Sequence, residues 1–143
     1  MSVVFFTDRD LGLQFPRILR EAGLSVERHR DHFAHDCADD VWLGGVGARG
    51  WVALTHDARI RYKPNELAAI VRHEVALLVI VGHAPYAELA RNFVNTLKQV
   101  KAFLETHRAP VIGKVYRPAP AELARNPTAS GTVELWYPKG SKK

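Results

Sequence analysis

Aspartate is missing from the last 86 residues of this 143-residue chain, because all seven aspartates lie between Asp8 and Asp57. Residues 1–57 carry six Lys/Arg and nine Asp/Glu, a formal charge of −3, whereas residues 58–143 carry fourteen and six, a charge of +8. An acidic site on a basic body suits a polyanionic substrate, since the basic part attracts phosphates and the acidic part can hold a metal ion. A basic surface that only aids solubility is the alternative.

Cysteine and long apolar runs are also scarce. Cys37 is the single cysteine, which excludes an internal disulfide. The apolar run from Ala76 to Gly82 is far too short to span a bilayer, and the run from Val3 to Phe6 is followed at once by charge, unlike a signal peptide. We therefore expect a cytoplasmic protein without a membrane segment, and 143 residues suffice for one domain with a real core.

Short β-branched or aromatic runs alternate with helical patterns along the chain. Strands are expected at Val3–Thr7, Ser25–His29, Trp51–Thr55, Ala76–Val81 and Pro110–Tyr116. Helices are expected at Leu11–Ala22, from Asp39 as N-cap to Gly50, from Pro64 to Val71, and from Pro85 to about His107. This alternation predicts an α/β fold in three layers, α/β/α, with a mainly parallel sheet of four to five strands.

Prolines change the character of the chain after Arg117. Those at positions 118, 120 and 127 break any long element. We therefore divide the chain into a main domain, residues 1–117, and a C-terminal extension, residues 118–143. Within the extension Thr132–Tyr137 fits one more strand, and the basic end Lys139–Lys143 is expected to be disordered.

Two aspartates, Asp8 and Asp57, each follow an apolar β-like run, and the pair Asp39 and Asp40 opens a predicted helix. Carboxyl ends of neighbouring parallel strands meet at the edge of the sheet where such folds bind ligands. Carboxylates gathered there repel one another unless a cation lies between them. Since hard oxygen ligands suit Mg²⁺ or Mn²⁺, the pattern predicts a metal-dependent enzyme acting on phosphate.

Each acidic position also has a purely structural explanation. Asp8 or Asp10 could cap a helix beginning near Leu11, Asp39 could cap its own helix, and Asp57 could form an Asx-turn on leaving a strand. Any one of these explanations is adequate alone. All of them together, with two acids at strand ends of one predicted sheet, favour a common site.

An ordered set of short motifs covers residues 3–81. It comprises FFTDRDLG from Phe5, LREAG from Leu19, HRDHF from His29, DDVW from Asp39, and GWVALTHD from Gly50, followed by Arg59-Ile60-Arg61. This order of a strand-end aspartate, a helix, a helix-borne acid and a Thr-x-Asp strand end resembles the PIN-like ribonucleases. The resemblance is to the VapC-type toxins of type II toxin–antitoxin systems in particular.

The resemblance implies an endoribonuclease that hydrolyses RNA with Mg²⁺ or Mn²⁺. By position, Asp8, Asp39 and Asp57 would be the metal ligands, with Asp40 as the second choice for the helix-borne catalytic acid. Many PIN nucleases have a fourth acid beyond the third. This sequence has no aspartate there, and Glu66 is the nearest carboxylate, which leaves one-metal and two-metal chemistry both open.

Arg59 and Arg61 follow Asp57 and are candidates to bind flanking phosphates, the alternative being solvated arginines or arginines paired with the acids. Thr55 is a candidate to position a carboxylate or water by a hydrogen bond. The resemblance also implies an RNA substrate, a cognate antitoxin that inserts a segment into the acidic pocket, and a homodimer.

Other classes of protein fit the sequence less well. A haloacid-dehalogenase-type phosphatase also begins with a strand and Asp-x-Asp, but needs a late acidic motif that this chain lacks. A response-regulator receiver needs a lysine after its last strand, and Lys114 falls within one. His29, His32, His35 and Cys37 are possible zinc ligands, but their spacing does not match that of known zinc sites. A nucleic-acid-binding or regulatory module with structural aspartates is the main non-enzymatic alternative.

Overall fold

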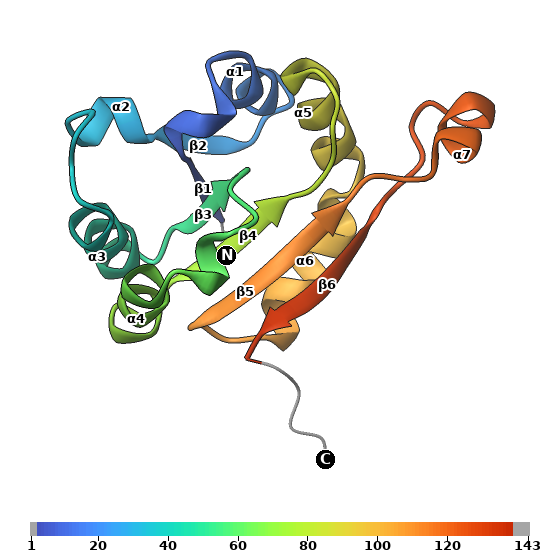
Figure 1. Ribbon diagram of the computed structural model, residues 1–143. Helices are drawn as coiled ribbons and strands as arrows, with labels where there is room; N and C mark the ends of the chain where they lie inside the picture. The colour runs from blue at the N-terminus through green and yellow to red at the C-terminus, as the bar shows by residue number, and fades with distance from the viewer. Residues whose placement is uncertain (1–2, 139–143) are drawn as a thin grey trace.

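The structure, a computed structural model, describes residues 3–138 and contains one six-stranded sheet in the order β2-β1-β3-β4-β5-β6 (Figure 1). The strands are β1 (Val4–Thr7), β2 (Ser25–Arg28), β3 (Val52–Thr55), β4 (Ala76–Ile80), β5 (Val111–Tyr116) and β6 (Thr132–Tyr137). Strands β1 to β5 are parallel, and β6 runs antiparallel to β5. The predicted α/β class with a mainly parallel sheet is confirmed, but the sheet has six strands instead of four to five, because β6 of the C-terminal extension pairs with β5. The tail at 139–143 lies outside the described residues.

Helices cover both faces of the sheet. They are α1 (Gln14–Glu21), α2 (His29–His32), α3 (Asp39–Arg49), α4 (Pro64–Arg72), α5 (Tyr86–Asn95), α6 (Leu97–Thr106) and α7 (Pro120–Arg125), with 3-10 turns η1 (Arg9–Leu11) and η2 (Ile60–Tyr62). Alternate strand residues point to opposite faces, so Phe5 and Leu78 pack under α1, α5 and α6, while Phe6 and Leu77 pack under α3 and α4. The sheet thus separates two apolar cores, with helices on both of its faces (Figure 1).

The register of the parallel strands aligns their carboxyl ends. Thr7 of β1 lies beside Leu54 of β3, and Thr55 lies beside Val79 of β4. The backbone N–H of Asp8 continues this pairing and donates to the carbonyl of Leu54 at 3.0 Å. The polar residues that follow β1, β3 and β4 are therefore held at one edge of the sheet.

The single long helix predicted for residues 85–107 is wrong, because the helix breaks at Thr96 into α5 and α6. The Thr96 hydroxyl is buried, donates to the carbonyl of Asn92 at 2.7 Å and accepts the backbone N–H of Gly131 at 2.9 Å. A hydroxyl bonded to a carbonyl four residues earlier is known to bend helices. The bend lets α6 pack against β6, the strand at the edge of the sheet.

Several predicted helix ends differ from the observed ones. Helix α1 begins at Gln14 rather than Leu11, because Arg9–Leu11 forms η1 first. Asp39 is the first residue of α3 and not its N-cap, which is Ala38. His29 begins the short helix α2 rather than ending a strand, and α7 was not predicted.

The glycines of α3 were expected to weaken that helix, and the structure gives them a packing role. A Cβ atom at Gly47 would lie 2.2 Å from the carbonyl oxygen of His73, at the end of α4, and one at Gly45 would lie 2.7 Å from the ring of Phe33. Glycine at these positions lets α3 approach its neighbours closely. The cost in helix propensity is offset by this packing.

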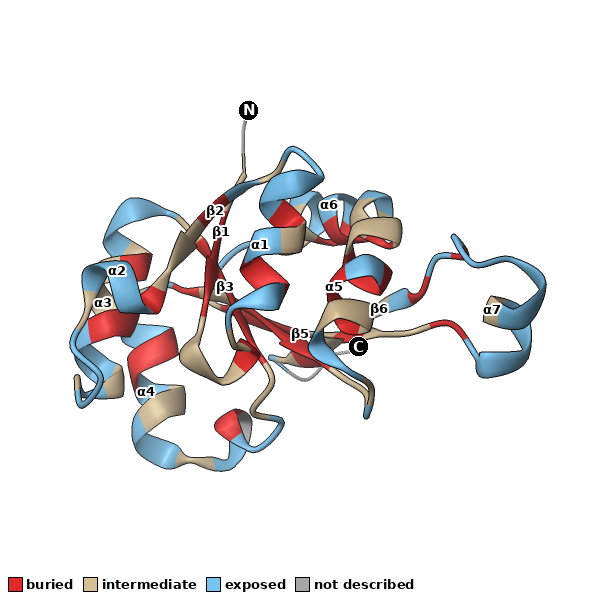
Figure 2. Cartoon of the chain, turned by 90° about the horizontal axis from the view of Figure 1, so that it is seen from above, coloured by how far each residue is buried: buried red, intermediate tan, exposed pale blue. Residues whose placement is uncertain are grey.

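The chain between β5 and β6 leaves the body of the protein as an arm (Figure 2). Helix α7 lies on this arm and buries none of its residues. The arm returns at Gly131, where a Cβ atom would lie 1.7 Å from the carbonyl oxygen of Tyr116. Among residues 3–138, no helix has the length and apolar character needed to cross a bilayer.

Candidate active site

Two aspartates meet at the carboxyl edge of the sheet. Asp8 and Asp10 each place a carboxylate oxygen 3.0 Å from the hydroxyl oxygen of Thr55, the last residue of β3. Asp10 also accepts the backbone N–H of His56 at 3.1 and 3.2 Å. Asp8 caps η1 by accepting the backbone N–H of Arg9 at 2.7 Å, as its structural explanation required.

Burial and mutual repulsion make this pair reluctant to ionise. Burial, followed by the charge of Asp10, raises the pKa of Asp8 to about 6 from 3.8, against the opposing hydrogen bonds from Thr55 and Arg9. Burial also raises the pKa of Asp10, although the N–H of His56 opposes it. Partly desolvated like charges are stabilised by a cation, so the pair has the electrostatics of a metal site.

From the sequence, Asp10 was paired with Asp8 in the motif that follows the first strand, but it was not predicted to be a metal ligand. The turn of η1 directs it back toward Thr55, 45 residues along the chain. The available signal was the Asp-x-Asp spacing immediately after a buried strand.

Asp57 lies close to this pair but both of its carboxylate oxygens are bonded. One oxygen accepts the ammonium of Lys63 at 2.8 Å, and the other accepts the backbone N–H of Arg59 at 3.0 Å, which is an Asx-turn. Burial tends to raise the pKa of Asp57, but the bonds from Lys63 and Arg59 outweigh it and hold this pKa below 3.8. The charge of Asp57 in turn contributes to the raised pKa of Asp10.

The helix-borne acids differ in where they point. Asp39 accepts the indole N–H of Trp42 at 2.8 Å, and its negative charge contributes to the raised pKa of Asp8. Asp40 is exposed and pairs instead with Arg72 and His73 of the α4 end, bonds that lower its pKa. Of the two residues, Asp39 is therefore the one whose charge acts on Asp8.

The remaining candidates lie at the margin of the site. The side chain of Arg59 is 80% exposed, with its Nε 3.4 Å from Asp57. The side chain of Arg61 lies outside the described residues. Asp39, Asp40 and Glu66 all line a hollow of about 420 Å³ between α3 and α4.

The histidines that suggested zinc do not gather. His29 is buried, and its Nδ1 accepts the Nε–H of Arg9 at 2.9 Å. Burial, followed by the charge of Arg9, lowers the pKa of His29. Nε2 of His32 lies 2.7 Å from Oε1 of Glu27, and His35 is exposed. No three His, Cys, Asp or Glu side chains within residues 3–138 lie in the arrangement of a complete metal cage.

Two carboxylates nevertheless fit Mg²⁺. This ion retains several water molecules and is commonly bound by one or two carboxylates together with substrate phosphates. Asp8 and Asp10 supply oxygen ligands only, and burial, the largest cause of their raised pKa values, disfavours the carboxylate charge that a bound cation would stabilise. The donor set thus suits Mg²⁺ or Mn²⁺ and not a soft metal.

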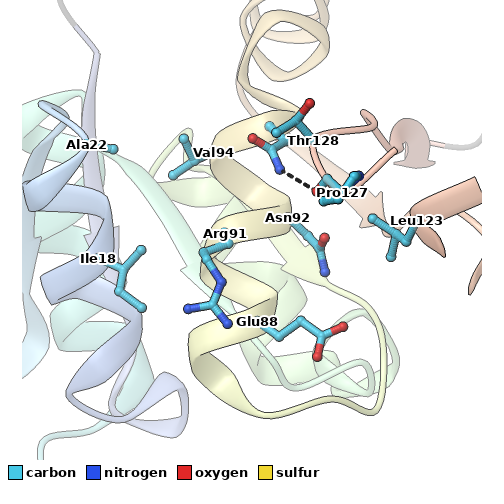
Figure 3. Close-up of a pocket in the computed structure, with 10 residues that line it drawn as sticks. Ile18, Ala22, Glu88, Arg91, Asn92, Val94, Leu123, Pro127 and Thr128 are labelled. Carbon is cyan, nitrogen blue, oxygen red and sulfur yellow. Dashed lines mark hydrogen bonds between the residues drawn. The ribbon is translucent and has the colours of Figure 1, made fainter. Parts of the chain in front are cut away.

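A separate hollow of 530 Å³ lies between α1, α5 and the arm (Figure 3). Ile18, Arg91 and Leu123 are among its lining residues, and no aspartate is. Asn92 also lines it, buried and with no hydrogen-bond partner for its amide nitrogen within the described residues. This hollow is unrelated to the acidic edge.

Comparison with known proteins identifies the class that this fold and edge define. A family model described as a PIN-like domain matches residues 3–82, more than half of the chain. The chain belongs to the PIN-like domain family, which displaces the haloacid-dehalogenase alternative.

A curated relative points in the same direction. The chain is 36% identical over 71 residues to "Putative ribonuclease VapC45" of Mycobacterium tuberculosis strain H37Rv. The match covers 46% of this chain and 51% of that protein, so the chain spans about half the length of its relative. No solved structure matches the chain.

Proposed function

We propose that the protein is a metal-dependent endoribonuclease. The observation that carries the proposal is the convergence of Asp8 and Asp10 on Thr55, with raised carboxyl pKa values, at the carboxyl edge of a PIN-like sheet. The similarity to a protein named as a ribonuclease supports RNA as the substrate. The charge of +8 on residues 58–143 supports attraction of a polyanion.

Asp8 and Asp10 would hold Mg²⁺ or Mn²⁺, with Asp39 and Asp57 as further ligands, directly or through water. A bound ion of this kind acidifies a water molecule and neutralises charge developing on the leaving oxygen. Thr55 orients the two central carboxylates by its hydroxyl. Asp57 must first be released by Lys63 and Arg59, since both its oxygens are bonded.

The phosphate contacts on either side of the cleaved bond would come from arginines. Arg59 is largely exposed, and its guanidinium can turn from Asp57 to a phosphate. Arg61 is proposed for the same role from its sequence position alone. Asp40 has no proposed part in catalysis, because it faces Arg72.

The biological setting is proposed by similarity. From the resemblance to the VapC-type toxins, which the name of the relative supports, we propose the toxin of a toxin–antitoxin pair. We propose further that it acts in the cytoplasm, is restrained by an antitoxin protein and assembles as a homodimer. We propose that residues 1–117 form the nuclease domain and that residues 118–143 form an extension to it. Strand β6 adds this extension to the edge of the sheet.

The test is cleavage of a pool of structured and single-stranded RNAs with Mg²⁺, Mn²⁺ or EDTA. We expect cleavage with either metal, none with EDTA, and a loss of at least about 100-fold for Asp8→Asn or Asp10→Asn. Asp36→Asn is the matched control, since Asp36 is exposed in the loop before α3. RNA binding without cleavage by the wild type would instead identify a binding module whose aspartates are structural.

A further inference from the structure

A third hollow is connected to the acidic pair through His56, which lines it and bonds to Asp10. It has a volume of about 430 Å³ and lies where the chain leaves β4, between β3 and the beginning of α5. Its walls are His56, Gly82, His83, Ala84, Pro85 and Tyr86. The proposed metal chemistry uses none of these residues.

The ring of Tyr86 is held in place without being buried. A Cβ atom at Gly12 would lie 3.2 Å from Cδ2 of Tyr86, and Gly12 has a φ of +72°, so glycine provides both the turn and the room for the ring. His56 packs at right angles to Tyr86, with ring centroids 5.8 Å apart and an interplanar angle of 82°. Tyr86 remains 38% exposed, which leaves part of its aromatic surface open to solvent.

His56 connects this hollow to the acids. Its backbone N–H donates to the carboxylate of Asp10, and its ring Nε2 lies 3.0 Å from the carbonyl oxygen of Gly82. A carbonyl oxygen can only accept, so Nε2 carries the proton and the ring is fixed at the wall of the hollow. One residue therefore contacts both Asp10 and Tyr86.

We propose that this hollow binds a nucleobase of a single-stranded RNA, stacked on Tyr86, next to the phosphodiester at the Asp8–Asp10 pair. The inference rests on the proposed ribonuclease function and deepens it. A fixed, partly exposed aromatic ring is the usual platform for an unstacked base, and every base has a face that stacks on it. The adjoining acids account for the neighbouring phosphate, because a metal held there would bind it.

The proposal makes Tyr86 an RNA-binding residue whose contribution does not require metal and does not depend on which base is stacked. Binding of fluorescently labelled single-stranded RNA pentanucleotides is measured by anisotropy in EDTA, where the proposed cleavage cannot proceed. Tyr86→Leu is expected to weaken binding about 10-fold or more, the usual effect of losing one stacked base. Tyr86→Phe keeps the ring and should bind like the wild type.

Tyr62→Leu is the matched control, since Tyr62 is 65% exposed and its ring contacts Trp136 instead of His56. The RNA provides a second arm that needs no variant: an abasic nucleotide is moved along the pentanucleotide. At one position, the abasic nucleotide should lower the affinity of the wild type about as much as Tyr86→Leu lowers it. At the same position, it should lower the affinity of the Tyr86→Leu variant very little further. Thermal unfolding verifies that each variant is folded.

Three results would each overturn the inference. Tyr86→Leu could bind RNA as tightly as the wild type, the wild type could fail to bind RNA in EDTA, or the abasic nucleotide could lower the affinity equally at every position. Cleavage in Mg²⁺ separates this from the proposed function. A wild type that cleaves RNA while Tyr86→Leu binds and cleaves normally leaves the nuclease intact and removes the base site. A wild type that binds RNA through Tyr86 but never cleaves it keeps the base site and removes the nuclease.

Discussion

Asp8 and Asp10 converge on one hydroxyl group, that of Thr55, with 3.0 Å between its oxygen and a carboxylate oxygen of each. A hydroxyl has a single proton, so it can donate to only one of the two carboxylates at a time. The other carboxylate faces a like charge in a partly buried place. The folded protein therefore carries an electrostatic cost that pH, mutation or a cation can relieve.

The first prediction concerns stability against pH. The pKa of Asp8 is about 6 in the folded protein and 3.8 in the reference state, so folding favours its protonated form. Stability is greatest below about pH 4 for this group and falls as the pH rises through about 6. Asp8→Asn keeps the capping ability and removes the charge, so it should stabilise the protein by about 1–3 kcal/mol at pH 7.5, measured by urea unfolding in EDTA.

The gain from Asp8→Asn should disappear near pH 4, where the wild-type carboxyl is protonated. Asp36→Asn, at an exposed position, should change neither the stability nor its pH dependence. A loss of stability for Asp8→Asn at both pH values would contradict the electrostatic explanation.

The second prediction distinguishes the two neighbouring acids of α3. Asp39→Asn should reduce metal-dependent RNA cleavage by about 10-fold or more, because the charge of Asp39 acts on Asp8 and would help to hold the metal. Asp40→Asn should have a much smaller effect, since Asp40 is paired with Arg72 at the surface. Initial rates measured for both variants decide the matter, and a larger loss for Asp40→Asn would reverse the assignment.

The third prediction concerns Lys63, whose ammonium bonds to Asp57 at 2.8 Å. If Asp57 is a metal ligand, this ammonium competes with the ion for the same oxygen. Lys63→Met should then bind Mg²⁺ several-fold more tightly in calorimetric titrations, by about the strength of one partly exposed ion pair. In a chain that already carries Asp57→Asn, adding Lys63→Met should leave the affinity unchanged. An unchanged affinity for Lys63→Met alone would place Asp57 outside the metal site.

The fourth prediction tests the packing of α3 on α4. Gly47→Ala should destabilise the protein by about 1–3 kcal/mol, because its Cβ atom would overlap the carbonyl of His73, a backbone atom that cannot turn away. Gly44→Ala is the comparison, since its Cβ atom would meet only the movable imidazole of His73 at 3.2 Å. Urea unfolding of both variants measures the difference. Equal stabilities would show that the helices can separate at no cost.

The strands could be predicted because β-branched and aromatic runs are local signals. The placement of Asp8 and Asp57 near the carboxyl ends of β1 and β3 could then be predicted from the positions of these strands. The direction of Asp10 could not, because it depends on η1 and on Thr55, far along the chain. The choice between Asp39 and Asp40 was equally hidden, since adjacent residues on a helix point about 100° apart. The contact of Lys63 with Asp57 depends on the path of the intervening loop.

The break at Thr96 shows the same limit. Apolar residues repeat at helical spacing on both sides of it, so periodicity alone predicts one continuous helix. The bend is tied to a hydrogen bond from Gly131, in a segment that the sequence showed only as rich in prolines. Long-range contacts of this kind leave no local pattern.

The arm and its return point will tolerate evolutionary change very differently. Helix α7 buries none of its residues, so insertions, deletions and substitutions within residues 119–128, none of which is buried, cost the core little. Substitution of Gly131 is not tolerated in the same way, because any side chain there would overlap the carbonyl of Tyr116. Relieving that overlap would break the hydrogen bond from the backbone N–H of residue 131 to the hydroxyl of Thr96. Homologous chains should therefore vary in the length of the arm while keeping glycine where it rejoins the sheet.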